Sequence, residues 1–394
     1  MKTRHGIVHI IFHPLAARRF VEPLAQALID DGMEAEIWVQ PVKGAEVFLA
    51  GLKVPVKFCP SNLGFNPLKA ATTFFALLGQ LKQRRPLVVH AHLFRGSFLP
   101  LLASFFCRVP VRIYHNHGVS YVGYRGLLRV ILMLIEAANC RLATHVATVN
   151  ESLRPALQAV APAGLPIIVF GPGSVCGLAP SEYAETLDPA RKAEARRDLG
   201  LNDNDLVLVY IGRPHVHKGF PVTIEAFDRL FAADPKVKLL ICGCSPVDVA
   251  RVCPQPPPGI RALGYVNDLH PIYRAADAVL LPSLYEGLPY SLLEGAAQGC
   301  AMIASQIPGP DALIEEGKNG LFIIPGDVDD LVRALNQIDQ NREELKMMGA
   351  AALEKALEFR RERIIVPYLA FMREVVAAAD SRFRTENTGD RLAA

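Results

Sequence analysis

Two basic residues in the C-terminal half of the chain have types and spacing that suit binding of a diphosphate. Arg213 and Lys218 lie in the segment IGRPHVHKGF, which directly follows the apolar run 206–212. Two cations at the carboxyl end of a strand can neutralise a leaving diphosphate, with Lys218 as a compact charge and Arg213 as a planar fork of donors. Taken alone, the same residues could form an exposed basic loop.

Two glutamates follow in the segment LPSLYEGLPYSLLEGAAQGCAMIAS, residues 281–305. Glu286 stands in a loop after a predicted strand, and Glu294 stands in a predicted helix whose first turn contains Pro289. The free N–H groups at such a helix start favour an anion, and Gly287 leaves room for close backbone approach. We therefore expect Glu294 to accept hydrogen bonds from ribose hydroxyls and Glu286 to reach a transferred sugar. The alternative is a strand, loop and helix with two surface glutamates.

The elements that must position these residues alternate between short apolar runs and helical patterns. Strands are predicted at 7–12, 35–39, 87–91, 111–115 and 144–149, and again at 206–212, 236–243, 278–282, 301–305 and 320–325. Helices are predicted at 21–29, 67–83, 96–107 and 124–139, from 151, and within 328–379. This alternation indicates α/β architecture, with parallel sheets covered on both faces. Ligands bind beyond the carboxyl ends of the strands in such sheets.

A chain of 394 residues is too long for one ordinary core, so two domains are expected. We predict a first domain over 1–170, a linker over 171–190 and a second domain over 191–360. A C-terminal helix over 361–384 is expected to cross back onto the first domain, and a disordered tail over 385–394 to follow it.

Cysteine spacing and hydropathy argue against several classes of protein. The eight cysteines are scattered without zinc-site spacing, so we expect reduced and mostly buried thiols. The longest apolar runs are too short for a membrane span, and the N-terminal run is typical of a buried strand rather than a signal peptide, so a cytoplasmic location is expected. Asp203 and Asp205 mimic an Asp-x-Asp metal motif, but they precede a strand and would lie at the wrong edge of the sheet. No metal site is predicted.

The charge is unevenly distributed along the chain. Residues 1–170 hold 18 Lys and Arg against 8 Asp and Glu, a net charge of about +10, and the rest carries about −7. Without stacking aromatics among the basic residues, this favours a membrane surface or a phosphorylated acceptor over nucleic acid. An uneven but merely solvated surface is the alternative.

Longer segments carry a family resemblance. In order and spacing, IGRPHVHKG, ALGYVNDLHPIYRAADAVLLPSLYEGLPYSLLEGAAQG and GPDALIEEGKNGLFIIPGD resemble the C-terminal domain of family-four retaining glycosyltransferases. Glu286 and Glu294, separated by seven residues, match the hallmark of that family. LVVHAHLFRGSFLP and YHNHGVSYVGYRGLLRVILMLIEAANC look like the acceptor domain of bacterial polysaccharide-type members. The resemblance covers about 350 residues and implies the GT-B fold, with two facing Rossmann-like domains and a deep interdomain cleft.

The resemblance also implies roles for individual residues. His117 matches the histidine that projects from the first domain toward the donor sugar, whereas His90, His92 and His115 are better explained as structural. The implied catalytic residues are His117, Arg213, Lys218 and Glu286, and the implied nucleotide-sugar contacts are Arg213, Lys218, Gly264, Tyr265, Val266, Glu286, Gly287, Leu288, Pro289 and Glu294. Where many relatives carry a glycine-rich turn after the first strand, this chain has Phe12-His13-Pro14, so Arg18 or Arg19 could instead meet an anionic acceptor.

The expected activity is retaining, metal-independent transfer of a hexose or N-acetylhexosamine from a nucleoside diphosphate, with UDP favoured, to a saccharide acceptor. A lipid-linked acceptor at the inner face of the plasma membrane is favoured, because the tract 124–135 is apolar apart from Arg125 and Arg129 and could lie at an anionic interface. In the alternative, its leucines pack in the core. A transferase with a soluble acceptor, a sugar-nucleotide epimerase and a non-catalytic nucleotide-sugar-binding protein remain open.

Overall fold

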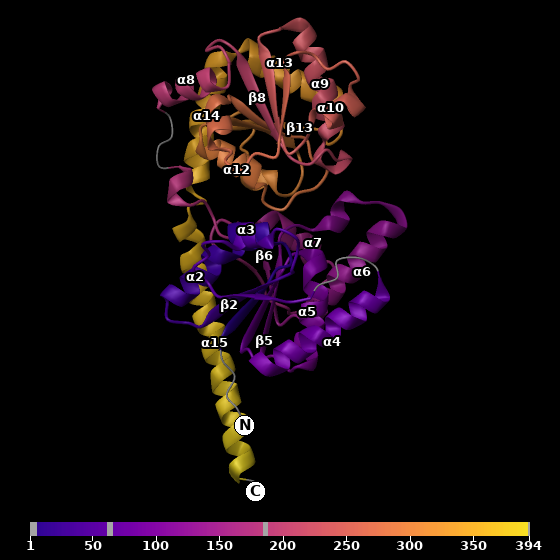
Figure 1. The fold of residues 1–394 in the computed structure, drawn as a ribbon, viewed down its shortest axis with the longest axis vertical. Coiled ribbons are helices and arrows are strands. Elements are labelled where there is room, and N and C mark those ends of the chain that lie inside the picture. The colour runs from indigo at the N-terminus through magenta and orange to yellow at the C-terminus, as the bar shows by residue number, and fades with distance from the viewer. Residues whose placement is uncertain (1–5, 61–65, 184–187, 393–394) are drawn as a thin grey trace. The chain divides into compact units, whose positions relative to one another are not determined.

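The chain folds into two α/β units, each with its own parallel sheet (Figure 1). The computed structural model describes residues 6–60, 66–183 and 188–392. Unit 1 comprises the chain up to Gly177 together with the segment from Glu362 onward, and unit 2 comprises Leu178–Arg361.

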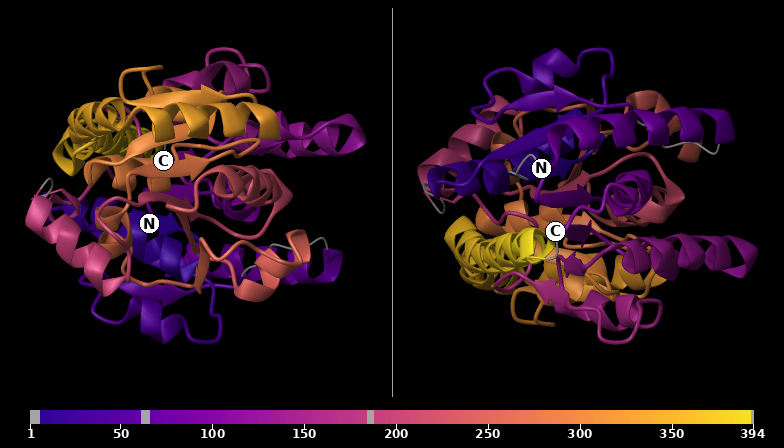
Figure 2. Two further views of the ribbon diagram at one scale, coloured as in Figure 1. Left: turned by 90° about the horizontal axis from the view of Figure 1, so that it is seen from above. Right: turned by 90° about the horizontal axis from the view of Figure 1, so that it is seen from below.

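Unit 1 contains a seven-stranded parallel sheet in the order β3-β2-β1-β4-β5-β6-β7. Its strands are β1 Ile7–Ile10, β2 Ala35–Val39, β3 Val56–Phe58, β4 Val88–His92, β5 Val111–Asn116, β6 His145–Thr148 and β7 Ile167–Val169. Its main helices are α2 Glu22–Asp30, α3 Ala45–Leu49, α4 Pro67–Arg84, α5 Phe94–Phe106, α6 Gly126–Leu142, α7 Arg154–Gln158 and α15 Arg361–Leu392. The long yellow helix α15 is seen nearly end-on in Figure 2.

Alternation along the central strands of unit 1 gives the two faces of the sheet different character. On one face Val8, Ile10 and Val89 pack with Trp38 and with Leu77 of α4 in a buried apolar cluster. The side chains of His9 on β1 and His90 on β4 alternate with these residues and therefore point to the other face. One face of the sheet is therefore an ordinary core, and the other carries polar side chains beneath α15.

Unit 2 contains a six-stranded parallel sheet in the order β10-β9-β8-β11-β12-β13. Its strands are β8 Leu206–Ile211, β9 Val237–Cys242, β10 Ile260–Gly264, β11 Ala278–Leu281, β12 Ala301–Ser305 and β13 Gly320–Ile323. Its helices are α8 Pro189–Asp198, α9 Phe220–Ala233, α10 Pro246–Val252, α11 His270–Ala275, α12 Tyr290–Ala297, α13 Val328–Gln340 and α14 Arg342–Leu357. Leu206, Leu208, Ile224, Phe227 and Leu239 belong to one large buried cluster between β8, β9 and α9.

Local sequence explains where several helices begin. Asn66 caps α4 by accepting a hydrogen bond from the backbone N–H of Lys69, and Pro67 fills the first helical position. Asp327 caps α13 in the same way through the N–H of Asp330. Each cap satisfies a backbone donor that the helix itself leaves unpaired.

The ten strands predicted from the sequence are present, most with slightly shorter bounds, and the fold class is confirmed as two-domain α/β. Three further strands, β3, β7 and β10, were not predicted. They lie at sheet edges, and their residues are mostly half-buried; β3 and β7 are only three residues long, and a charged residue interrupts β3 and β10. The tail predicted to be disordered from 385 is helical to Leu392 as a continuation of α15, because extending a formed helix costs less than starting one, and residues 393–394 lie outside the described part of the chain.

Candidate functional site

The strand order of unit 2 places its candidate site. Neighbouring strands β8 and β11 are followed by connections that leave in opposite directions along the sheet, since β9 lies on one side of β8 and β12 on the other side of β11. In doubly wound sheets this switch point opens a crevice beyond the carboxyl ends of the strands. The segment with Arg213 and Lys218 follows β8, and the segment with Glu286 follows β11. Residues that are distant in sequence are thus brought to one edge of the sheet.

The loop after β8 is held in place by buried groups beneath it. The hydroxyl of the buried Tyr210 lies 3.1 Å from the carbonyl oxygen of Arg213 and 3.2 Å from that of Lys218. Gly219 has a φ of +67°, and a Cβ built there would lie 2.0 Å from the carbonyl oxygen of Pro282. A side chain at this position would therefore push the β8 loop away from the β11 loop.

Lys218 and Glu286 form an ion pair that joins these two loops. The Lys218 Nζ lies 2.6 Å from Glu286 Oε1, with the lysine side chain 32% exposed and the glutamate 10% exposed. Arg213 is exposed, and within the described residues it makes no ion pair. The site thus presents one cation already fixed by a carboxylate and one whose guanidinium is open to an anion.

Glu294 lies in the second turn of α12 and is almost completely buried at 8% exposure. The hydroxyl of Tyr273 in α11 donates a hydrogen bond of 3.3 Å to Glu294 Oε2. The prediction that Pro289 lies in the first helical turn was wrong by one position: Pro289 is the N-cap, with a ψ of 103° outside the helical range, and no side chain caps this helix start. The positive end of the dipole of α12 therefore lies at a helix start that no side chain caps.

The remaining nucleotide-contact residues predicted from the resemblance also lie at the carboxyl ends of the strands of unit 2. Gly264 is the last residue of the edge strand β10, Tyr265 and Val266 follow it, and Tyr265 is 66% exposed. Leu288 is buried, whereas Gly287 packs against Gly309, where a Cβ would lie 2.2 Å from the Gly287 carbonyl oxygen. Three residues of the site were not predicted from the sequence: Tyr210, Tyr273 and Gly309. The sequence can indicate that a tyrosine is buried or that a glycine lies in a turn. It does not indicate which residues these three contact.

Unit 1 places His117 directly after β5, at the carboxyl end of its sheet. The Asn116 Oδ1 accepts a hydrogen bond of 2.9 Å from the Gly118 N–H, and its Nδ2 donates to Glu136 Oε1 at 3.0 Å. Tyr114 also donates to Glu136 Oε1, at 2.7 Å. Burial raises the pKa of Glu136 to about 7, although the hydrogen bonds from Tyr114 and Asn116 oppose this shift. A buried polar network under the loop therefore holds the backbone that carries His117.

The other candidates in unit 1 divide into buried and exposed groups. His90, His92 and His115 are fully buried, in accord with a structural interpretation, and burial lowers their pKa values well below the usual range. Arg18 and Arg19 are exposed on a π-helical turn, η1, Ala17–Val21, between β1 and α2.

The Asp-x-Asp sequence of unit 2 lies at the opposite edge of its sheet from Arg213, because Asp205 directly precedes β8. The Asp205 Oδ2 accepts a hydrogen bond of 2.9 Å from the Asn202 N–H, and the backbone carbonyl of Asp203 accepts one from the Arg196 guanidinium. These groups close a turn at the amino ends of the strands. They are distant from the residues that meet at the switch point.

Helix α6 of unit 1 exposes an apolar surface. Leu127 is 75% exposed and Leu134 is 65% exposed, and the surface also includes Leu128, Val130 and Ile131. Arg125 and Arg129 are exposed beside them. The alternative that these leucines pack in the core is therefore wrong for this face, and only residues such as Leu132 point inward. No helix in the described ranges is long and apolar enough to cross a membrane.

Comparison with known proteins identifies both halves of the chain. Residues 16–173 match the model of the glycosyl transferase 4-like domain, and residues 191–355 match that of the glycosyl transferases group 1. The chain is 26% identical over 266 residues to an uncharacterized glycosyltransferase of Methanocaldococcus jannaschii, covering 64% of this chain and 65% of the relative. It is 23% identical over 304 residues to the UDP-Gal:alpha-D-GlcNAc-diphosphoundecaprenol alpha-1,3-galactosyltransferase of Escherichia coli, covering 70% of this chain and 72% of that protein.

Several other curated relatives are matched over about half of their length, for example a putative glycosyltransferase of Bacillus subtilis over 50%. Among solved structures, Anabaena HepE in complex with UDP and glucose superimposes with a TM-score of 0.76 at 18% identity, covering 95% of this chain and 100% of that one. This structural likeness supports the same two-domain fold.

Proposed function

Because the chain belongs to the group 1, family-four type of glycosyltransferases with the GT-B fold, we propose that it transfers a hexose or N-acetylhexosamine from UDP to a saccharide acceptor with retention of anomeric configuration. The observation that carries the proposal is the Lys218–Glu286 pair at the switch point of unit 2, beside the uncapped start of α12. Two cations and the start of α12 are brought together there, and a phosphate would compete with Glu286 for Lys218.

The chemistry proposed for unit 2 is stabilisation of the leaving group. As the bond between the anomeric carbon and the diphosphate oxygen breaks, its electron pair stays with the diphosphate, whose negative charge increases. Lys218, Arg213 and the N–H groups of α12 would stabilise that charge, which is larger in the transition state than in the bound donor. Glu294, with Tyr273 against its other oxygen, would accept hydrogen bonds from the ribose. Glu286 would orient Lys218 and reach the sugar.

Retention is proposed to occur on a single face of the sugar. The acceptor hydroxyl would bond to the anomeric carbon from the side that the diphosphate leaves, and its proton would pass to the leaving diphosphate oxygen. Glu136, a carboxylate buried in unit 1, does not suit a double displacement, because it is fully buried and bound by Tyr114 and Asn116. This mechanism needs no divalent metal, so we propose metal-independent transfer.

The acceptor is proposed to be lipid-linked. The exposed leucines of α6, flanked by Arg125 and Arg129, fit a surface that lies in an interface with anionic headgroups. The name of the Escherichia coli relative gives a diphosphoundecaprenol-linked acceptor for that protein, and another relative is named as a capsular polysaccharide biosynthesis enzyme of Staphylococcus aureus. Together these favour a role on the membrane surface in the assembly of a surface polysaccharide.

A donor screen tests the core of the proposal. The protein would be heated with UDP-glucose, UDP-galactose, UDP-N-acetylglucosamine, UDP-N-acetylgalactosamine and GDP-mannose, each with EDTA present. A donor at about 100 times its dissociation constant adds roughly 2.7 kcal/mol to stability, so the cognate one should stand out. The anomer formed with that donor would then be read by NMR. Loss of activity in EDTA, or an inverted product, would contradict the mechanism.

Liposome sedimentation tests the acceptor side separately. We expect binding to vesicles that contain anionic phospholipid, less binding at high salt, and weaker binding after Leu127→Ser and Leu134→Ser. A matched control is Leu68→Ser, on another exposed apolar residue of unit 1, which is 78% exposed on α4. Equal absence of the wild-type protein from anionic and neutral vesicles would leave a soluble acceptor as the better hypothesis.

A further inference from the structure

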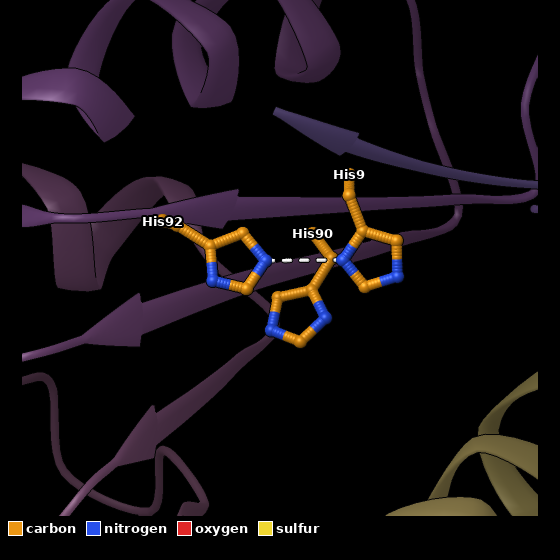
Figure 3. A group of neighbouring side chains, drawn as sticks. All are labelled: His9, His90 and His92. Carbon is orange, nitrogen blue, oxygen red and sulfur yellow. Dashed lines mark hydrogen bonds between the residues drawn. The ribbon is translucent and has the colours of Figure 1, made fainter. Parts of the chain in front are cut away.

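Five histidines line one face of the sheet in unit 1. In the parallel register, His9 of β1 is paired with His90 of β4, and His92 is paired with His115 of β5. Because side chains two residues apart on a strand share a face, His90 and His92, like His115 and His117, are neighbours along the strand direction. Figure 3 shows the rings of His9, His90 and His92 converging from two adjacent strands. The cluster lies at the switch point between β1 and β4.

These imidazoles are neutral at physiological pH. His9, His90, His92 and His115 are fully buried, and desolvation lowers the pKa of His9 and that of His117 to about 3. A neutral imidazole has one N–H donor and one bare nitrogen acceptor. In a row of such rings, each hydrogen bond therefore fixes which nitrogen of the next ring carries its proton.

Three of the histidines form such a row with a buried tyrosine at its inner end. The Tyr368 hydroxyl of α15 lies 3.4 Å from His9 Nε2, the longest contact of the row. His9 Nδ1 lies 3.0 Å from His92 Nε2, and His92 Nδ1 lies 3.2 Å from His117 Nε2. His117, which is partly exposed, ends the row.

The buried tyrosine sets the direction of the row. Tyr368 is fully buried, and within the described residues its hydroxyl has His9 as its hydrogen-bond partner. A buried hydroxyl that fails to donate loses a hydrogen bond without compensation, so Tyr368 donates to His9 Nε2. The proton of His9 must then be on Nδ1 and be donated to His92, and the proton of His92 must be on its Nδ1 and be donated to His117.

We propose that Tyr368, His9 and His92 are positioning residues that fix His117 as the Nδ1–H tautomer. His117 Nε2 is occupied as an acceptor, so its remaining ring nitrogen can only donate. A group bound against that nitrogen must offer an oxygen lone pair, such as that of a sugar hydroxyl. The assignment of a sugar as this group rests on the proposed function, whereas the tautomer itself does not.

A metal ion is the competing explanation for the cluster. Nitrogens of His9, His90 and His92 lie within 4.8 Å of one another, a spacing that zinc could bridge. Within the described residues, however, the only titratable groups that act on the pKa values of these imidazoles are the other imidazoles. Zinc bound here would keep its full double charge, and it would need free ligand nitrogens, whereas His9 Nδ1 already lies 3.0 Å from His92 Nε2 and His90 Nε2 lies 3.2 Å from His115 Nδ1. The geometry is better explained by hydrogen bonds.

NMR of the full-length, ligand-free protein tests the tautomers directly. Two-bond 1H–15N correlation spectra of a sample with 15N-labelled histidine report which nitrogen of each ring carries the proton, and single substitutions assign the signals. We expect His9, His92 and His117 all to be Nδ1–H tautomers near pH 7.5. His92→Leu should return His117 to the Nε2–H form that free imidazole side chains prefer, and Tyr368→Phe, which removes one hydroxyl, should shift His117 in the same direction.

His90→Leu is the matched control. His90 is an equally buried imidazole on the same face, but its Nε2 contacts His115 and it is not a member of the row. His117 should keep the Nδ1–H tautomer in this variant. An Nε2–H tautomer of His117 in the wild type, an unchanged His117 in both His92→Leu and Tyr368→Phe, or one equivalent of zinc bound to the histidines in the purified protein would each overturn the proposal.

A kinetic measurement links the tautomer to transfer. With a donor identified by the screen, Tyr368→Phe should lower kcat about tenfold, the size expected for one lost hydrogen bond that matters most in the transition state, with KM for the donor little changed. His90→Leu should not do so. If no nucleotide sugar binds, the proposed function fails while the NMR result stands by itself.

Discussion

The two units place polar side chains at equivalent points of similar sheets, yet the chemistry there is opposite. In unit 1 the switch point between β1 and β4 carries buried, neutral imidazoles that bond to one another. In unit 2 the switch point between β8 and β11 carries a partly exposed ion pair and an exposed arginine. The fold supplies the location in both cases, and solvent access decides whether the groups there are charged.

That difference suits two different tasks. Neutral groups fixed by burial can direct a hydrogen bond with a defined donor, but they do little for a full negative charge. Charged groups near solvent can stabilise a diphosphate and still release it, because water screens the charges when the ligand leaves. The contrast leads to predictions that separate the two units.

The largest expected effect is selective acid unfolding of unit 1. Its buried histidines have lowered pKa values, so their contribution to stability is present above pH 6.5 and is lost as the pH falls toward 3. Each additional proton bound by the unfolded state lowers the free energy of unfolding by about 1.4 kcal/mol for each step of one in pH. The five histidines of the cluster could together lower it by up to about 7 kcal/mol for each such step. Glu136 opposes this, since its raised pKa adds stability between pH 7 and 4.5, but it is a single group.

Hydrogen exchange measured by mass spectrometry between pH 7 and 4 would follow each unit in the same molecule. The histidines of unit 2, at 215, 217 and 270, are not buried, so unit 2 is the internal control. Peptides of β1, β4 and β5 should lose protection first. If both units lost protection at the same pH, after correction for the intrinsic pH dependence of exchange, the acid sensitivity would not be specific to unit 1.

The next largest effect is on turnover in unit 2. Lys218→Ala should lower kcat about 100-fold or more, and Arg213→Ala should act in the same direction, because each cation opposes charge that grows as the donor bond breaks. The control is Lys346→Ala, whose side chain is 72% exposed and pairs with Glu343. Steady-state kinetics with the identified donor would check this. A higher KM with unchanged kcat would show that Lys218 contributes uniform binding only.

A smaller effect is expected on nucleotide affinity. Glu294→Ala should weaken binding of free UDP by about tenfold or more, since hydrogen bonds to a charged group are worth roughly 1.5–3 kcal/mol and are made in the ground state as well. Glu294→Gln, which keeps one acceptor oxygen, should lose less. Isothermal titration calorimetry with UDP is the measurement, and equal affinity in Glu294→Ala and wild type would remove Glu294 from the ribose site.

The sequence predicts the two units unequally well. In unit 2 the chemical residues lie within short segments that each follow a strand, so Lys218, Glu286 and Glu294 could be assigned to loop and helix before any fold was known. In unit 1 the row from Tyr368 to His117 depends on the register of β1, β4 and β5 and on the return of α15, which join residues 83 and 359 positions apart. The sequence shows histidines alternating along the strands, but it does not show which nitrogens meet.

The exposure of the α6 side chains also could not be predicted from the local sequence pattern. The apolar tract of α6 is equally compatible with a core stripe and with an open surface, and only the neighbours of the helix decide between them. The short edge strands β3, β7 and β10 were missed for a related reason. Their pairing is set by the strand beside them rather than by their own residues.

The smallest predicted effect concerns Glu136, a buried carboxylate beneath the His117 loop. Its pKa is raised from 4.5 to about 7, so the stability it contributes in the protonated form is lost as the pH rises through 7. Glu136→Gln keeps an acceptor oxygen for Tyr114 and Asn116 but carries no charge. The variant should therefore gain stability relative to wild type by about 1 kcal/mol between pH 6 and pH 8. Urea unfolding at both pH values would measure this gain, with Glu151→Gln at an exposed position as the control. A pH-independent difference between variant and wild type would show that Glu136 is ionised throughout this range. Unit 1 would then be less distinct from unit 2 than the burial of Glu136 implies.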